Sequence, residues 1–172
     1  MPMATLSEQE LIRRSKLEAL KKLAINPYPA ALYPVDFFAS RLPDAYKEGK
    51  KVVVAGRIMS RRIQGKASFT ELLDPTGKIQ LYLNRDEMCS GEDKTLYNEV
   101  YKKLLDIGDI IGVEGTLFTT KEGQMSINVN QLTVLSKSLK PLPLPKTDSE
   151  CNTYDEFNDP EQRYRQRYVD LI

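Results

Sequence analysis

The sequence contains no histidine and only two cysteines, Cys89 and Cys151. Without histidine there is no Ser-His-Asp or Cys-His catalytic arrangement, and no zinc site that depends on imidazole. Two cysteines so far apart cannot supply a four-cysteine zinc site, and they suit free thiols in a reducing compartment. Neither a GxGxxG nor a GxxxxGK[ST] phosphate loop is present. These absences exclude several enzyme classes for residues 1–172 and favour a binding function.

Long apolar runs and a strong net charge are also missing. The formal net charge is +1, so total charge alone does not predict a nucleic-acid partner. Apolar stretches such as 52–55 and 110–113 have the length of a strand, whereas a membrane helix needs about 20 residues. The first ten residues lack the basic and apolar regions of a secretory signal. We therefore expect a cytoplasmic protein with no membrane partner.

An amphipathic helix is predicted over residues 7–25. Ser7 and Glu10 have the spacing of a capping box, in which each side chain satisfies a backbone donor at the helix start. The apolar side chains expected on one face of this helix are Ile12, Ala19, Leu20 and Leu23. Pro27 ends the helix because proline disfavours the helical conformation of the residue before it.

Short β-type runs follow from residue 51 to residue 136. The expected strands are residues 51–59, 68–73, 78–84, 109–119 and 125–135. The Asp-Pro-Thr-Gly turn at residues 74–77 predicts a hairpin between the second and third strands. Leu96, Val100 and Leu104 predict a helix between the third and fourth strands. This order is typical of a five-stranded OB barrel, so the predicted fold class is mainly β, and α+β with the N-terminal helix included.

Five parts of the chain are predicted from these patterns. They are an N-terminal amphipathic helix (1–26), an extended connector (27–50), an OB-fold domain (51–138), a proline-rich linker (139–153) and the start of a further, helical domain (154–172).

Alternation along the strands predicts which side chains face outward. Ile79, Leu81 and Leu83 must form the core, so Gln80 and Tyr82 stand on the outer face. If Leu72 is also core, Phe69 lies outside, on the same sheet as Gln80. The alternative, in which Phe69 packs inward or under a loop, stays open at this point.

A basic cluster spans the end of the first strand and the turn after it. Arg57, Arg61, Arg62 and Lys66 lie within ten residues that contain no acid. Such a cluster can be the electrostatic footprint of a nucleic-acid site. It can equally be a solvated turn.

Residues 54–88 resemble the anticodon-binding domain of class II lysyl-tRNA synthetases. The pattern GKxxFxxLxDxxGxIQ, at residues 65–80, is shared with the related aspartyl and asparaginyl enzymes. Arg61-Arg62-Ile63 and the segment GDIIGVEGTLFTTKEGQMSI resemble the lysyl enzymes in particular. The final RYRQRYVDLI resembles the entrance to the lysyl catalytic domain, so the resemblance implies that residues 154–172 are the start of a truncated catalytic domain. Residues 27–50 match only loosely.

The resemblance implies roles for individual residues. Phe69 would stack on the central uracil of the lysine anticodon, Gln80 would read the edge of that base, and Arg62 would contact the same base. Gln124 stands where family members often carry a glutamate that contacts the third anticodon base. Weaker candidates for phosphate or stem contacts are Arg57, Arg61, Lys66, Arg13 and Arg14.

The resemblance also implies what the complete enzyme does. It would be a homodimer that activates lysine with ATP and Mg²⁺ and transfers it to tRNA(Lys). No adenylate-forming residue is expected within residues 1–172, so this chain should hold no cofactor, bind no metal and be inactive alone.

Four other interpretations remain at the level of sequence. The chain could be a general single-strand-binding OB protein, although only one basic cluster is evident. It could be an aspartyl or asparaginyl synthetase domain, against which Arg61-Arg62 and residues 163–172 argue. It could belong to a lipid-lysylating protein, or be a purely structural barrel in which Phe69 is buried.

Overall fold

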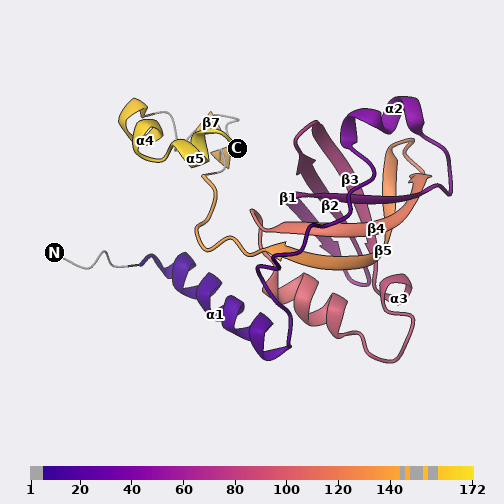
Figure 1. Ribbon diagram of the computed structural model, residues 1–172, viewed down its shortest axis with the longest axis horizontal. Helices are drawn as coiled ribbons and strands as arrows, with labels where there is room; N and C mark the ends of the chain where they lie inside the picture. The colour runs from indigo at the N-terminus through magenta and orange to yellow at the C-terminus, as the bar shows by residue number, and fades with distance from the viewer. Residues whose placement is uncertain (1–5, 144–145, 148–152, 155–158) are drawn as a thin grey trace. The chain divides into compact units, whose positions relative to one another are not determined.

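The computed structural model describes residues 6–143, 146–147, 153–154 and 159–172. The chain divides into two compact units, Met1–Leu139 and Lys140–Ile172. Figure 1 shows the first unit as a β-barrel with helices attached. Cys151 lies outside the described residues, whereas Cys89 is buried and free.

Five strands close into the barrel of the first unit. They are β1 (Lys51–Gln64), β2 (Ala67–Asp74), β3 (Gly77–Asn84), β4 (Ile110–Thr119) and β5 (Met125–Ser136). Their order around the barrel is β1-β2-β3-β5-β4, and β3 with β5 is the parallel pair. The predicted five-stranded barrel is therefore confirmed.

Alternating side chains of these strands form the core, as the sequence pattern predicts. Val52, Val54 and Ile58 of β1 are buried, and so are Leu72 of β2 and Leu81 of β3. Burying aliphatic side chains stabilises the fold by about 1.5–3 kcal/mol each. The side chains between these buried residues point outward, away from the core.

The connection from β3 to β4 carries the predicted helix. It consists of α3 (Arg85–Met88) and the π-helix η2 (Leu96–Leu104). Tyr97 and Tyr101 of η2 are fully buried, and their hydroxyls are each 2.7 Å from a β2 hydroxyl, that of Ser68 and that of Thr70 respectively. Buried hydroxyls need such partners. These pairs explain why β2 carries polar residues on its inner face.

The helix α1 (Glu8–Lys22) begins with the predicted capping box, since Ser7 and Glu10 exchange both hydrogen bonds. Its predicted apolar face is only partly correct. Leu20 is buried, but Ile12 is 40% exposed and Arg13 is buried in its place. Arg13 Nη1 and Nη2 donate to the carbonyls of Ser138 (3.1 Å) and Ile107 (2.9 Å). Polar contacts to the barrel, and not only apolar ones, set the orientation of this helix.

An ion-pair network lies beside Arg13. The fully buried Lys137 ammonium is 2.7 Å from Asp106 and 2.8 Å from Asp109, and Lys16 of α1 is 2.5 Å from Asp106. Burial alone would raise the pKa of Asp106, but the hydrogen bonds from Lys137 and Lys16 hold it below its ordinary value. Burial raises the pKa of Asp109 despite the same lysine.

Two short helices interrupt the segment predicted to be an extended connector. They are η1 (Ala39–Arg41) and α2 (Leu42–Ala45). Leu42 of α2 and Phe37, which precedes η1, are buried. The carboxylate of Asp74 accepts from Ala39 N at 2.7 Å and from Thr76 N at 2.7 Å. One aspartate thus fixes both the β2–β3 turn and the approach of the connector.

The second unit contains a pair of two-residue strands, β6 (Lys146–Thr147) and β7 (Thr153–Tyr154), and the helices α4 (Pro160–Arg165) and α5 (Arg167–Asp170). Asp159 caps α4 and Pro160 occupies its first turn, which is where proline is tolerated in a helix. Among the residues that the structure describes, no helix is long and apolar enough to cross a membrane.

Candidate nucleic-acid interface

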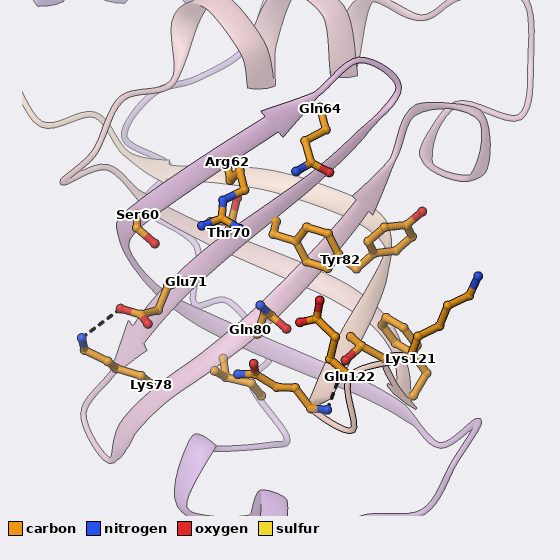
Figure 2. A pocket seen from close by; sticks show the side chains of 15 residues that line it. Ser60, Arg62, Gln64, Thr70, Glu71, Lys78, Gln80, Tyr82, Lys121 and Glu122 are labelled. Atoms are coloured by element: carbon orange, nitrogen blue, oxygen red, sulfur yellow. Dashed lines mark hydrogen bonds and ion pairs between the residues drawn. The ribbon is translucent and has the colours of Figure 1, made fainter.

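A hollow of about 670 Å³ lies on the outer face of the barrel. Its floor comes from β1, β2 and β3, and its rim includes the turn between β4 and β5 (Figure 2). All four residues for which the resemblance implies base contacts line it: Arg62, Phe69, Gln80 and Gln124.

Strand register explains why these residues meet. Arg62 of β1 is the register partner of Phe69 on β2, and Phe69 is the partner of Tyr82 on β3. A second row runs from Glu71 through Gln80 to Ser126 of β5. Neighbouring register partners stand on one face of a sheet. Register therefore brings Arg62, Phe69 and Gln80 to one surface, and Gln124 joins them from the turn between β4 and β5.

Three aromatic rings form a continuous platform at the hollow. The centroids of Phe69 and Tyr82 are 5.2 Å apart, and those of Tyr82 and Phe118 are 5.7 Å apart. Phe69 is half-buried against Tyr82 and lies outside the core cluster. The interpretation in which Phe69 packs among the core aliphatics is therefore wrong. Phe118 is not among the residues predicted for the site, although its alternation with the buried Leu117 indicates an outward side chain.

Gln80 is held by Ser126, a neighbour that the strand pattern does not predict. The hydroxyl of Ser126 donates to Oε1 of Gln80 at 2.8 Å, and Ser126 is fully buried beside it on the neighbouring strand β5. The amide nitrogen of Gln80 and the remaining lone pair of Oε1 are left for a ligand. This side chain can present a donor and an acceptor side by side.

The β4–β5 turn forms the opposite rim. Thr120 N donates to the carbonyl of Gln124 at 2.9 Å, and Gln124 N donates to Oγ1 of Thr120 at 3.1 Å. Gly123 has a φ of 85°, a conformation that favours glycine. Figure 2 shows Lys121 and Glu122 on this turn, with the Glu122 side chain extending over the hollow.

Charges around the hollow are mixed. Arg62 and Lys121 are exposed cations, and Glu122 is an exposed acid. Lys78 and Glu71 pair at 2.9 Å at the far edge. In the described ranges, no group of three or more cysteine, aspartate or glutamate side chains could hold a metal ion. The chemistry available here is stacking, hydrogen bonding and attraction of phosphate.

The weaker candidates lie elsewhere. Nη1 of Arg57 donates to the carbonyl of Gly108 at 2.8 Å, and Nη1 of Arg61 donates to the carbonyl of Tyr101 at 2.5 Å. Both guanidinium groups are thus engaged in holding η2 and the β4 entrance. Lys66 is exposed, 3.7 Å from Asp86.

The two arginines of α1, Arg13 and Arg14, differ in their exposure to solvent. Arg13 is buried, and its Nη1 and Nη2 each donate to a backbone carbonyl, so the structure does not present it to solvent for the expected contact with an RNA stem. Arg14 is exposed. The structure brings neither of them to the hollow.

Residues 52–135 match the family model of the tRNA anticodon type, described as an OB-fold nucleic acid binding domain. The match covers all five strands and the helical connection between them. The barrel is therefore an OB-fold nucleic acid binding domain.

Three curated relatives extend the likeness over nearly the whole chain. A lysine–tRNA ligase of Christiangramia forsetii is 64% identical over 98% of this chain, and one of Azobacteroides pseudotrichonymphae is 54% identical over 97%. A lysine–tRNA ligase of Porphyromonas gingivalis is 51% identical over 100% of it. The chain belongs to the lysine–tRNA ligase family, as its motifs predict. It spans 30–34% of the length of these relatives.

Proposed function

We propose that the barrel binds the anticodon loop of a lysine tRNA and that its hollow holds the central uracil. The observation that carries the proposal is the convergence of Phe69, Gln80 and Arg62 at one hollow. The family membership supports it, because the relatives are named for a reaction that requires recognition of this tRNA.

Phe69 supplies affinity in this proposal. A base that leaves the loop stack can lie on the exposed face of the ring, which Tyr82 supports from the side. Base–aromatic stacking is worth about 1–3 kcal/mol and does not distinguish one base from another.

Gln80 supplies selectivity. Uracil presents an N3–H donor beside carbonyl acceptors, which complement the Oε1 acceptor and the Nε2 donors of glutamine. Cytosine carries an acceptor at N3 and an amino donor beside it. A glutamine held in one orientation would leave a group unpaired with cytosine, at a cost of about 1–3 kcal/mol.

Arg62 adds a charged donor from the β1 side of the hollow. It can donate to a uracil carbonyl and attract the adjacent phosphate, and it stays charged throughout the physiological pH range. Lys66 and Arg14, both exposed, are left as contacts to phosphates outside the hollow. Such contacts position the RNA without reading its sequence.

Gln124 is proposed to contact the third anticodon base. It stands on the β4–β5 turn, one residue after Gly123, and Ser126 Oγ lies 2.8 Å from Gln80 Oε1 and 3.4 Å from the Gln124 carbonyl oxygen. Its carboxamide oxygen can accept from uracil N3–H as a carboxylate would, but without the charge.

The complete protein is proposed to be a lysine–tRNA ligase that uses ATP and Mg²⁺, works as a homodimer and resides in the cytoplasm. Residues 154–172 would then open its catalytic domain, and residues 1–172 alone would bind RNA without aminoacylating it. The proposed parts 1–26, 27–50, 51–138 and 139–153 precede that domain.

General single-strand binding is the alternative that the aromatic platform leaves. Phe69, Tyr82 and Phe118 could stack bases of any sequence. The tethered Gln80 favours selective reading over this alternative, because an untargeted platform has no need of a fixed carboxamide.

Titration of the chain with anticodon stem-loops tests the proposal. Loops carrying UUU and CCC, on the same stem, should differ in affinity by at least about tenfold, since each unpaired group costs about 1–3 kcal/mol. Affinity for both should fall steeply with salt because of the phosphate contacts. Equal affinity for the two loops at moderate salt would overturn the proposal in favour of general binding.

A further inference from the structure

We propose that Phe118 is a second base-stacking residue, which holds the third anticodon base while Phe69 holds the central one. This inference rests on the proposed function and adds to it how a second base is bound. It starts from an aromatic side chain on the outer face of β4 that is not part of the barrel core.

Phe118 is an apolar side chain in an otherwise polar row. Alternate residues of β4 point outward, and the two that precede Phe118 in this row are Glu114 and Thr116. The neighbouring Leu117 is fully buried in the core, whereas Phe118 is only partly buried. The ring therefore lies outside the core, and part of its surface is open at the hollow that it helps to line.

The ring continues the aromatic series that begins at Phe69. Tyr82 stands between the two phenylalanines in this series, with its centroid 5.2 Å from that of Phe69 and 5.7 Å from that of Phe118. Phe69 belongs to β2 and Phe118 to β4, two strands that β3 and β5 separate in the barrel. Bases stacked on each other lie about 3.4 Å apart along a strand. We therefore expect the outer rings to hold two bases that are splayed apart, as is common in recognition of RNA loops.

The contact between Tyr82 and Phe118 leaves room for a base. The two rings meet at 60°, in an edge contact and not face to face. At least one face of Phe118 is therefore not covered by Tyr82. Because a base stacks on the face of an aromatic ring, Phe118 can hold a base and keep its contact with Tyr82.

Strand register assigns Phe118 to the part of the hollow that Gln124 lines. Phe118 is the register partner of Ser126, and Oγ of Ser126 lies 3.4 Å from the carbonyl oxygen of Gln124. Phe69, in contrast, is the register partner of Arg62 on β1. A base on the Phe118 ring is therefore next to Gln124, the residue proposed to contact the third anticodon base.

Tryptophan substitution tests the inference, because the sequence contains no tryptophan. Phe118→Trp keeps an aromatic face and places one fluorescent indole at this position. A UUU anticodon stem-loop should quench its fluorescence when the base stacks on the indole. At saturation, a loop whose third anticodon nucleotide lacks its base should quench it several-fold less. A loop that lacks the central base should quench it as the intact loop does.

Phe69→Trp is the matched control for the position of the base. Its fluorescence should respond to removal of the central base and not of the third. Any response of both tryptophans to the same base would place the two rings on one base and overturn the inference.

Phe118→Leu separates stacking from packing, because leucine keeps an apolar side chain beside Tyr82 but has no ring face. It should bind the UUU loop about five- to 150-fold more weakly, the effect of one stacked base. The loss should disappear for the loop that lacks the third base. Tyr46→Leu is the control: Tyr46 is partly buried, its hydroxyl lies 2.6 Å from that of Thr119, and it does not line the hollow. This substitution should leave the affinity unchanged.

Two results would overturn the stacking role and leave Phe118 as a support for Tyr82. One is quenching of Phe118→Trp that does not depend on the third base, and the other is a loss in Phe118→Leu that persists without that base. The proposed function would still stand if Phe69→Trp responds to the central base. If neither tryptophan responds to removal of its base, both proposals fail. The tryptophan variants answer the question if Phe118→Leu does not fold.

Discussion

Arg61 and Arg62 are consecutive on β1, but only Arg62 lines the hollow. Arg61 contacts η2 instead: its Nη1 donates to the carbonyl of Tyr101, and its guanidinium lies 5.5 Å from the centroid of the Tyr101 ring. Consecutive residues of a strand point to opposite sides. Arg62 is therefore placed to contact a ligand in the hollow, and Arg61 is placed to stabilise the fold. The basic cluster in the sequence does not distinguish these two roles.

Substituting the two arginines in turn should give opposite results. Arg62→Ala should weaken binding of a UUU stem-loop by about 1.5–3 kcal/mol, the range for a hydrogen bond from a charged group, and leave unfolding unchanged. Arg61→Ala should lower the free energy of unfolding by about 1–3 kcal/mol, because the Tyr101 carbonyl loses its donor. Urea unfolding and stem-loop titration of both variants measure this. Equal losses of RNA affinity in the two variants would contradict the assignment.

Phe69→Ala should weaken binding of every stem-loop by about 1–3 kcal/mol through loss of stacking. The ratio of U-loop to C-loop affinity should stay near that of the wild type, since stacking does not distinguish the bases. Phe69→Tyr keeps the ring and should keep the affinity. Fluorescence anisotropy with labelled loops provides the measurement, and wild-type affinity in Phe69→Ala would mean that the base does not lie on this ring.

The outward face of the sheet could be predicted because strand alternation is a local property. Leu81 must be buried, so Gln80 and Tyr82 must face outward, and no tertiary knowledge is needed for this. Phe69 followed from the same reasoning. Their meeting at one hollow required only that the second and third strands form a hairpin, which the Asp-Pro-Thr-Gly turn indicates.

The contacts that sequence reasoning missed depend on pairings between distant segments. Ser126 meets Gln80 because β5 lies parallel to β3, a register that no turn sequence encodes. Arg13 meets Ser138 across 125 positions of the chain, and a helix pattern read by periodicity treats such an arginine as solvent-facing. An arginine side chain can donate to a backbone carbonyl as well as to a phosphate, so the residue type alone does not identify its partner.

Gln124→Ala should weaken binding of a UUU loop by about 0.5–1.5 kcal/mol, the net value of one hydrogen bond. The loss should disappear when the third anticodon base is changed to one without an N3–H donor. Gln131 of β5 is the matched control, because it is an exposed glutamine that does not line the hollow. If Gln124→Ala and Gln131→Ala bind alike, Gln124 does not read a base.

The network around Lys137 should control stability and its dependence on pH. Lys137→Met removes the partner of two carboxylates and should cost about 3–5 kcal/mol, the range for breaking a buried ion pair. Asp106→Asn should also destabilise the fold at neutral pH, because Lys16 and Lys137 both lose a charged acceptor.

The sign of the pH effect follows from the lowered pKa of Asp106 in the folded state. The stability that this carboxylate contributes is present above its unfolded pKa, about 3.9, and is lost as pH falls through the lower folded value. Asp109, whose pKa is raised by burial, acts in the opposite sense. Urea unfolding at several pH values should therefore show wild type and Asp106→Asn converging from about pH 5 to about pH 3. A constant difference over that range would contradict the lowered pKa.

The central claim is that Gln80 reads one pyrimidine on the outer face of the barrel. Its most direct test is the affinity of wild type and Gln80→Ala for two stem-loops that differ only in the central anticodon base, U or C. We expect the wild type to prefer U by about tenfold, the effect of about 1.4 kcal/mol, and Gln80→Ala to bind both loops alike. A preference that survives in Gln80→Ala, or a wild type that binds both loops equally, would contradict the claim.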